Sequence, residues 1–376
     1  MSRLRIVADD KIPYLEGAFE DVAEVIYLPG AAITKEEIRH ADALIIRTRT
    51  KCNQSLLEGT KVKFIATATI GYDHIDTDYC RQAAIQWTNA PGCNSGSVMQ
   101  YIASALVSIA AKFNFSLKGK KLGIVGVGNV GEKVVHLAEQ LGMEVLKNDP
   151  PRQEHEPDAG FLNLDDVLSQ SDILTFHVPL EMHGRFKTHH LVDTELLKKV
   201  KPGVFIINSS RGEVVNSADL NQSLKEKQIG GAILDVWENE PRISENLMAQ
   251  VTLGTPHIAG YSRDGKANGT MMSVQALSRY FNLGKDHWQP FDVEPPVYPV
   301  ITIPQGVKDT AVLPFCIHHT YQVAEDDAAL RGNLKEFEKL RGDYPVRREF
   351  SSFTIDQSLA NENLKQKLMS LGFKLK

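Results

Sequence analysis

Three polar clusters, each directly after a short apolar run, contain side chains that could together oxidise an alcohol. Arg211 lies in the first cluster, Glu240 in the second and His257 in the third. Taken alone, each would more often be a surface charge or a satisfied core group. Ligands of open α/β sheets bind at the carboxyl ends of strands, so residues in these positions can share one site. A histidine can accept the hydroxyl proton, a carboxylate can orient its ring, and an arginine can bind an anionic substrate. We therefore predict that Arg211, Glu240 and His257 are catalytic.

A glycine-rich string, GIVGVGNVG at 123–131, has the G-x-G-x-x-G spacing of a dinucleotide-binding turn. The string alone also fits a glycine turn that binds no nucleotide. Here it joins an expected strand at 121–125 to an expected helix at 132–141, which is the context that the motif requires. The sequence therefore predicts a nucleotide site at this turn.

The individual glycines have distinct expected roles. Gly126 permits a tight turn, Gly128 lets the backbone approach a pyrophosphate, and Gly131 lets the helix pack closely on the strand. Asp149 ends the next expected strand, where a carboxylate accepts the ribose hydroxyls and repels a 2′-phosphate. This pattern favours NAD over NADP, while the neighbouring cation Arg152 weakens the preference.

Short apolar runs alternate with helical stretches through most of the chain, which predicts an α/β fold with parallel sheets. In the first ninety or so residues the expected strands are 4–8, 25–28, 43–47, 64–68 and 85–88. In the second module they are 121–125, 144–148, 173–177, 204–208 and 231–234. The second set is sufficient for a doubly wound sheet.

Changes in composition predict the domain boundaries. The segment 95–112 is an expected buried helix that joins the two modules, and the helix 268–283 returns to the first module. Prolines after Gln289 mark a linker, and a charged helix is expected at 330–340 within a small α+β appendage. The predicted domains are a substrate (lid) domain at 1–94 and 262–288, an NAD-binding domain at 95–261, and a C-terminal domain at 289–376.

Composition excludes several classes of protein. The 376 residues include 42 Lys and Arg against 47 Asp and Glu, a net charge of −5 that is unlike that of nucleic-acid-binding proteins. The four cysteines form no CxxC pair, which argues against disulfides and structural zinc, and we predict no metal site. No apolar stretch approaches the ~20 residues of a membrane span, and no signal peptide is visible. We expect a cytoplasmic protein that binds neither nucleic acid nor a membrane.

The order Gly126–Gly131, Asp149, Arg211, Glu240, His257 resembles the D-2-hydroxyacid dehydrogenase family. Longer strings resemble its erythronate-4-phosphate dehydrogenase branch, over essentially the whole chain. The strings are TATIGYDHID (67–76), APGCNSGSV (90–98), ILTFHVPL (173–180), DVWENEP (235–241), HIAGYSRDGKANGT (257–270) and YPVRREFSS (344–352). This resemblance implies a Rossmann-type NAD domain, a flavodoxin-like substrate domain and a small α+β C-terminal dimerisation domain, in a homodimer.

The resemblance also implies a role for each site residue. His257 would take the proton of the C2 hydroxyl, Glu240 would orient the imidazole, and Arg211 would bind the substrate carboxylate. The implied cofactor contacts are Gly126, Gly128, Asn129, Val130, Gly131, Asp149, Val178, Ser209, Ser210, Arg211, Asp235 and Gly260. The implied substrate contacts are Thr48, Thr69 and Tyr261. Thr48 stands where the family commonly has serine, and Val178 where it commonly has threonine.

The implied reaction is the NAD-dependent oxidation of 4-phospho-D-erythronate to (R)-3-hydroxy-2-oxo-4-phosphooxybutanoate, in pyridoxal 5′-phosphate (vitamin B6) biosynthesis. Its phosphate needs cations, and the loop Arg47-Thr-Arg-Thr-Lys51 offers three, with Arg47 as the first candidate. Arg347 and Arg348 are a second hypothesis, as residues that reach the site from a partner subunit. Two alternatives remain: a dehydrogenase of 3-phosphoglycerate or glycerate, and a binding module that senses NAD(H).

Overall fold

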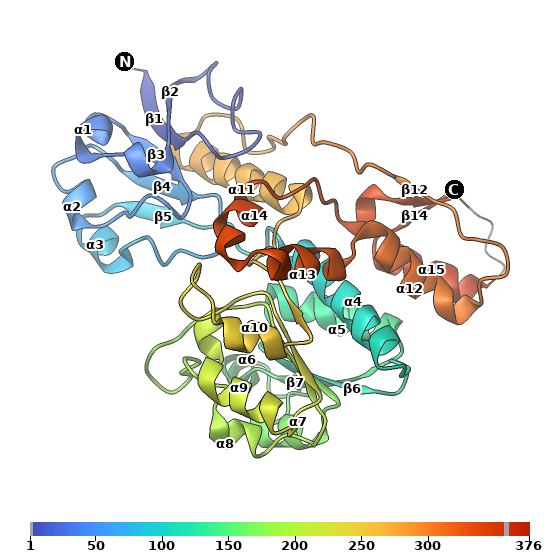
Figure 1. Ribbon diagram of the computed structural model, residues 1–376. Helices are drawn as coiled ribbons and strands as arrows, with labels where there is room; N and C mark the ends of the chain where they lie inside the picture. Colours follow the sequence, from blue (N-terminus) through green and yellow to red (C-terminus); the bar gives the residue numbers. More distant parts are fainter. Residues whose placement is uncertain (1–2, 357–360) are drawn as a thin grey trace. The chain divides into compact units, whose positions relative to one another are not determined.

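The computed structural model describes residues 3–356 and 361–376, whose strands form parallel sheets covered by helices (Figure 1). The chain divides into two compact units, which are described separately. Unit 1 comprises Met1–Asn94 with Ser262–Glu294, and unit 2 comprises Ser95–Tyr261 with Pro295–Lys376. Because residues 295–376 belong to the same unit as 95–261, a separate C-terminal domain at 289–376 stays a prediction.

Unit 1 contains a five-stranded parallel sheet in the order β2-β1-β3-β4-β5, which is the flavodoxin-like order. Its strands are β1 (Leu4–Asp9), β2 (Ala23–Leu28), β3 (Ala43–Ile46), β4 (Phe64–Thr67) and β5 (Gln86–Thr88). One face packs on the helices α1 (Lys35–Ile38), α2 (Gln54–Leu57) and α3 (Thr77–Gln82). The other face is covered by α11 (Arg263–Phe281), through Val274 and Leu277.

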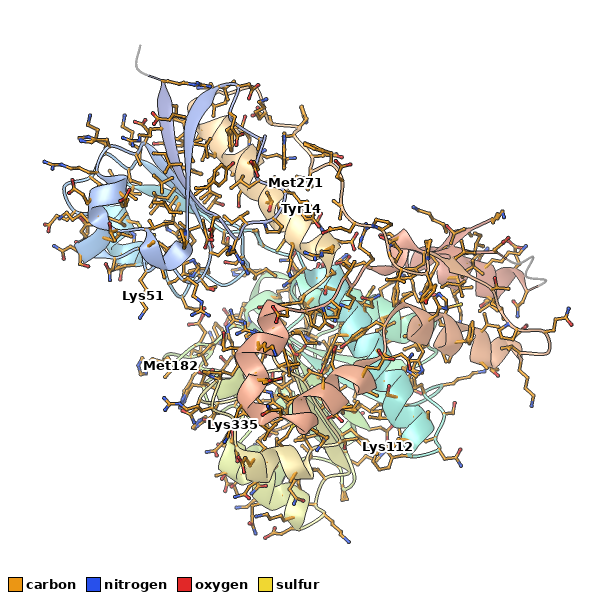
Figure 2. The ribbon with its side chains drawn as sticks, turned by 45° about the horizontal axis from the view of Figure 1, so that its top comes forward. Tyr14, Lys51, Lys112, Met182, Met271 and Lys335 are labelled. Atoms are coloured by element: carbon orange, nitrogen blue, oxygen red, sulfur yellow. The ribbon has the colours of Figure 1, made fainter. Side chains whose placement is uncertain are left out.

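The loop after β1 runs along α11. Figure 2 shows Tyr14 of this loop beside Met271 of the helix. The Thr270 hydroxyl donates a hydrogen bond of 2.8 Å to the Pro13 carbonyl. The helix begins at Arg263, earlier than the expected 268, because the Ser262 side chain caps it by accepting from the Gly265 amide.

Unit 2 is built around a six-stranded parallel sheet in the order β11-β10-β9-β8-β6-β7. Its strands are β6 (Lys121–Val125), β7 (Glu144–Asn148), β8 (Ile173–Phe176), β9 (Phe205–Asn208), β10 (Gly231–Leu234) and β11 (Leu253–Gly254). Phe161 forms an isolated parallel bridge with Lys147 of β7, in the place of a further edge strand. With that bridge counted, the order is that of a Rossmann sheet, whose ligand crevice lies where the strand order reverses, between β6 and β8.

Helices precede and connect the parallel strands of unit 2. They are α4 (Ser95–Lys112), α5 (Asn129–Gln140), α6 (Pro150–His155), α7 (Leu164–Gln170), α8 (Thr194–Leu197), α9 (Ser217–Lys225) and α10 (Glu245–Gln250). No helix among the described residues is long and apolar enough to span a bilayer.

The C-terminal segment packs on α4, which is buried along most of its length. It contains α12 (Asp309–Thr320), α13 (Val323–Gly332), α14 (Phe337–Gly342) and α15 (Glu362–Ser370), with the short strands β12 (Val300–Ile301), β13 (Thr354–Ile355) and β14 (Lys374–Leu375). Buried polar groups join the two parts. The Ser104 hydroxyl of α4 donates to the Tyr321 carbonyl and accepts from the Val323 amide.

The prediction of a single charged helix at 330–340 is wrong. The helix α13 ends at Gly332, and Asn333 leaves the helical conformation with φ −160°. The Asn333 side chain then accepts from the Lys335 amide and starts a 3-10 turn at Leu334–Glu336 before α14. An asparagine that binds the following backbone competes with helix continuation, which explains the break.

Asp172 connects the two central strands of the Rossmann sheet at their amino ends. Its carboxylate accepts from the Lys121 amide at 2.9 Å and from the Lys201 ammonium at 2.6 Å. Burial opposes the charged form, but these hydrogen bonds and the nearby Lys120 outweigh it, so the pKa of Asp172 lies below its ordinary value.

Asp172→Asn is expected to reduce the free energy of unfolding by about 1–2 kcal/mol at pH 7. A carboxyl with a lowered native pKa stabilises the fold above its unfolded pKa of about 4, and that contribution is lost as the pH falls through the native value. In denaturant unfolding, the difference in free energy of unfolding between wild type and variant should therefore be largest at pH 7 and should decrease below pH 4. Asp165→Asn, which removes an exposed ion pair with Lys199, is the control and should change stability by less than about 0.5 kcal/mol. If the stability difference between wild type and Asp172→Asn were unchanged at low pH, this account would be contradicted.

Candidate active site

The glycine turn after β6 has the close backbone packing expected of a nucleotide-binding loop. Gly126 has φ +88°, and a Cβ there would lie 2.5 Å from the His177 carbonyl oxygen and 2.8 Å from a Val178 methyl group. A Cβ on Gly131 would lie 2.2 Å from the Gly126 carbonyl oxygen. Two of the three glycines are thus required by the protein's own packing.

Gly128 differs, because nothing lies within 4 Å of the position that its Cβ would take. Its backbone is extended, a conformation that other residues adopt. The chain itself therefore gives no reason for glycine at this position, whereas a ligand that approaches the backbone does. Ser209, directly after β9, supplies a second such observation: its buried Oγ has no hydrogen-bond partner among the described residues.

Asp149, at the end of β7, also lies at this turn. Its carboxylate accepts from the Val127 amide at 2.8 Å and from the Arg152 amide at 3.0 Å, which caps α6. The Arg152 guanidinium bonds the carboxylates of Glu132 and Glu156. Because two anions already neutralise it, Arg152 offers little attraction to a 2′-phosphate, and the site favours NAD.

Beneath the turn, His177 stays neutral. Burial lowers its pKa to about 3, and its Nε2 lies 2.9 Å from the Thr175 hydroxyl. The residue whose backbone packs against Gly126 therefore carries no charge.

His257 and Glu240 form a hydrogen-bonded pair. His257 Nδ1 lies 2.7 Å from Glu240 Oε2, and Glu240 Oε1 accepts from the Trp237 amide at 2.9 Å. The two side chains are 34% and 20% exposed, so a substrate can reach them. When Nδ1 carries the proton and donates to Glu240, Nε2 has its lone pair free to accept a substrate proton.

The loop that carries His257 is held by a buried carboxylate. Asp235, which follows β10 and is 1% exposed, accepts from the Thr255 hydroxyl at 2.6 Å and from the amides of Ile258 and Ala259 at 2.8 and 2.9 Å. His257 itself adopts φ +57°, a left-handed conformation that costs a non-glycine residue of order 1–3 kcal/mol. Asp235 thus fixes the loop, and its predicted contact with NAD stays a prediction.

Arg211 enters the same region on the turn after β9. A Cβ on the following Gly212 would lie 2.0 Å from the Trp237 carbonyl oxygen, so this turn packs directly against the backbone that leads to Glu240. Arg211 Nη1 donates to the Ser210 carbonyl at 2.9 Å, and the Ser210 hydroxyl donates to Asn208 Oδ1. The three predicted catalytic residues therefore lie on loops that contact one another.

Tyr261 has a neighbour that the sequence did not indicate. Its hydroxyl accepts from Arg341 Nη2 at 3.0 Å, and the guanidinium lies over its ring at 5.6 Å from the centroid. No spacing rule connects two residues 80 positions apart, so only the fold reveals the contact. Arg347 is 4% exposed and donates to Ser97 and to the Ala259 carbonyl of its own chain. The hypothesis that Arg347 and Arg348 reach the site of a partner subunit stays a prediction.

The other predicted substrate residues lie in unit 1, after neighbouring strands. Arg47 and Thr48 follow β3, and Arg47 Nη1 donates to the Lys11 carbonyl at 3.0 Å. Thr69 follows β4, and its hydroxyl donates to the Gly71 carbonyl at 2.9 Å. Figure 2 shows Lys51 projecting from the loop after β3, where it is exposed. No cluster of three or more potential metal-binding residues occurs among residues 3–356 and 361–376.

Comparisons with known proteins identify the family of this chain. Residues 103–259 match the family model of the D-isomer specific 2-hydroxyacid dehydrogenase NAD binding domain, and residues 293–372 match a domain of unknown function, DUF3410. An erythronate-4-phosphate dehydrogenase of Bacteroides fragilis is 48% identical over 353 residues, covering 94% of this chain and 99% of the relative. One of Shigella flexneri is 42% identical over 357 residues, covering 94% of each chain.

The chain belongs to the erythronate-4-phosphate dehydrogenase family. Solved structures of 2-hydroxyacid dehydrogenases share its fold. The NAD⁺-bound 3-phosphoglycerate dehydrogenase of Entamoeba histolytica has a TM-score of 0.64 at 25% identity, covering 77% of this chain and 99% of that one. The D-lactate dehydrogenase of Aquifex aeolicus has a TM-score of 0.61 at 25% identity, covering 78% and 100%.

Members of this family are NAD-dependent oxidoreductases, and this chain is one, as its Rossmann sheet and family match require. The residues fit the cofactor, because Gly128 leaves room for a pyrophosphate and Ser209 has an unused hydroxyl. The remaining predicted contacts stay predictions: Asn129 and Val130 lie in the first turn of α5, and Ser210 lies on the turn after β9.

Gly128→Ala is expected to lose NAD affinity, whereas Gly131→Ala is expected to lose stability. Gly128→Ala should fold with unchanged thermal stability but bind NAD at least tenfold more weakly, because the new methyl group occupies ligand space. Gly131→Ala should lose about 1–3 kcal/mol of stability, because its methyl group overlaps the Gly126 carbonyl. Titration calorimetry with NAD and thermal denaturation measure the two effects. Wild-type NAD affinity in Gly128→Ala would contradict the assignment of this space to the cofactor.

Proposed function

We propose that this chain oxidises 4-phospho-D-erythronate to (R)-3-hydroxy-2-oxo-4-phosphooxybutanoate with NAD, in pyridoxal 5′-phosphate synthesis in the cytoplasm. The observation that carries the proposal is the His257–Glu240 pair, in a chain 42–48% identical to enzymes named for this substrate. A competing 3-phosphoglycerate activity has weaker support, because the similar solved structure is 25% identical.

The chain's own residues account for each proton and charge of the reaction. When bound, NAD accepts the hydride from C2 of the substrate. His257 accepts the hydroxyl proton at Nε2, and Glu240 stabilises the resulting imidazolium through Nδ1. Arg211 binds the carboxylate and stabilises the negative charge on the forming carbonyl oxygen.

The substrate phosphate requires cations outside this proton-transfer group. The loop after β3 provides Arg47, Arg49 and Lys51 at the carboxyl edge of the unit 1 sheet, where ligands of such sheets bind. Thr48 and Thr69 add hydroxyl groups for the polar backbone of the substrate. These assignments follow the family resemblance and the position of the loops.

The reaction can be tested by following NADH formation with 4-phosphoerythronate, 3-phosphoglycerate and glycerate, with a 2-oxo acid present to reoxidise any retained NADH. We expect turnover with 4-phosphoerythronate alone. His257→Ala should lower kcat by about 10²–10⁴-fold and leave NAD affinity unchanged, because it removes the base and no cofactor contact.

Turnover of another acid only would support a 2-hydroxyacid dehydrogenase activity but refute 4-phospho-D-erythronate as the substrate. If none of the three acids is turned over although NADH is bound, the NAD(H)-sensing alternative is favoured. Near-wild-type kcat in His257→Ala would refute the assignment of the base.

A homodimer is the second part of the proposal. In the segment after Pro295, Val297 and Tyr298 are each 73% exposed and Val300 is 47% exposed, a concentration of apolar surface that favours a protein contact. The resemblance assigns dimerisation to this C-terminal region.

Light scattering after gel filtration should give twice the chain mass of 41.8 kDa for the wild type. Tyr298→Glu combined with Val297→Glu should shift the mass toward one chain, because two charges would be buried at the contact. Met182→Glu, at a 46% exposed site on the loop after β8 (Figure 2), is the control and should remain dimeric. A wild-type monomer would refute the dimer.

A further inference from the structure

Arg341 of α14 is a half-buried cation beside the catalytic loop. Its Nη2 donates to the Tyr261 hydroxyl at 3.0 Å, its Nη1 donates to Glu338 at 3.2 Å, and its Nε is buried without a partner among the described residues. A guanidinium has five N–H donors, so donors remain for a ligand.

The groups around Arg341 stabilise its positive charge. Burial disfavours the charged guanidinium, but Tyr261, Glu240 and Glu338 outweigh this effect and raise the pKa of Arg341. The side chain therefore stays cationic, and it lies close enough to Glu240 for their charges to interact. Glu240 in turn bonds His257, so the cation borders the site of proton transfer.

The loop from His257 to Tyr261 is positioned for this contact from the C-terminal segment as well. Arg347 donates to the Ala259 carbonyl, and the ring of Tyr344 meets that of Tyr261 edge-on at 5.9 Å. These contacts fix Tyr261 in front of α14. Arg347 is only 4% exposed and cannot meet a ligand, whereas the side chain of Arg341 is 23% exposed.

We propose that Arg341 is a specificity-determining residue, which with Tyr261 binds the phosphate-bearing end of the substrate. The inference rests on the proposed function. A four-carbon substrate whose first carbon is a carboxylate and whose last carbon bears a phosphate needs a cation at each end. Arg211 has the first role, and a phosphate carries about −1.5 to −2 charge, which favours more than one cation around it.

The alternative is that Arg341 only supports Tyr261. That structural role would affect phosphorylated and unphosphorylated substrates equally, whereas a phosphate contact affects only the first. The two substrates therefore separate the two roles.

The test uses the full-length protein with 4-phospho-D-erythronate and with unphosphorylated D-erythronate. Arg341→Gln should raise KM for the phosphorylated acid about 10–100-fold, the loss expected for a charge-assisted hydrogen bond, with kcat changed less than about threefold. It should leave kcat/KM for D-erythronate and the affinity for NAD unchanged. Arg341→Lys should recover part of the loss, because the charge remains.

Glu338→Gln is the matched control, since it removes the anion paired with Arg341 and keeps the cation. Its KM for the phosphorylated acid should be unchanged or lower. An equal loss on both acids in Arg341→Gln, or no loss on either, would overturn the inference, and retained NAD affinity would exclude misfolding as the cause. A wild type inactive on 4-phosphoerythronate would overturn the proposed function as well, so the two failures are distinguishable.

Discussion

The site depends on one buried negative charge, the carboxylate of Asp235. A charge removed from water is tolerable only when hydrogen bonds satisfy it, and here the hydroxyl of Thr255 and two successive amides do so. The backbone must bend to present both amides to one carboxylate. That bend places His257 in a left-handed conformation, from which its ring reaches Glu240. The strained backbone of the catalytic base is therefore maintained by an acid that need not contact the substrate.

The environment of Asp235 extends the constraint. Thr255 also bonds the hydroxyl of the buried Tyr101 in α4, and the indole of Trp237 donates to the Thr255 carbonyl at 2.9 Å. The buried guanidinium of Arg347 lies close enough for its charge to interact with Asp235. Residues from three parts of the chain thus converge on a single loop, which explains why it can hold a conformation that its own sequence does not favour.

Much of this could be predicted from the sequence, for physical reasons. Central strands of a parallel sheet are buried on both faces, so they are continuous apolar runs, and the predictions of strands at 121–125 and 231–234 match the observed bounds. The strand 144–148 also matches its predicted bounds, although it is only partly buried. The glycine motif is recognisable because packing requires glycine at positions 126 and 131. The contact of Arg341 with Tyr261 could not be predicted, since it depends on tertiary packing between distant segments. The break at Asn333 is not predictable from the charge pattern, because a local side-chain hydrogen bond to the Lys335 amide interrupts the helix.

The first turn of α4 limits how the nucleotide-binding part and the C-terminal segment can be separated. Gly96 has no space for a side chain, because the carboxylate of Glu349 lies where a Cβ would stand. A carboxylate at the start of a helix complements its dipole. The nucleotide-binding half and the C-terminal segment are therefore not interchangeable modules: a chimaera that grafts either onto a relative must exchange residues 96 and 349 together. The same reasoning makes the boundary near Pro295 a poor place to truncate the chain, although prolines mark it as a linker.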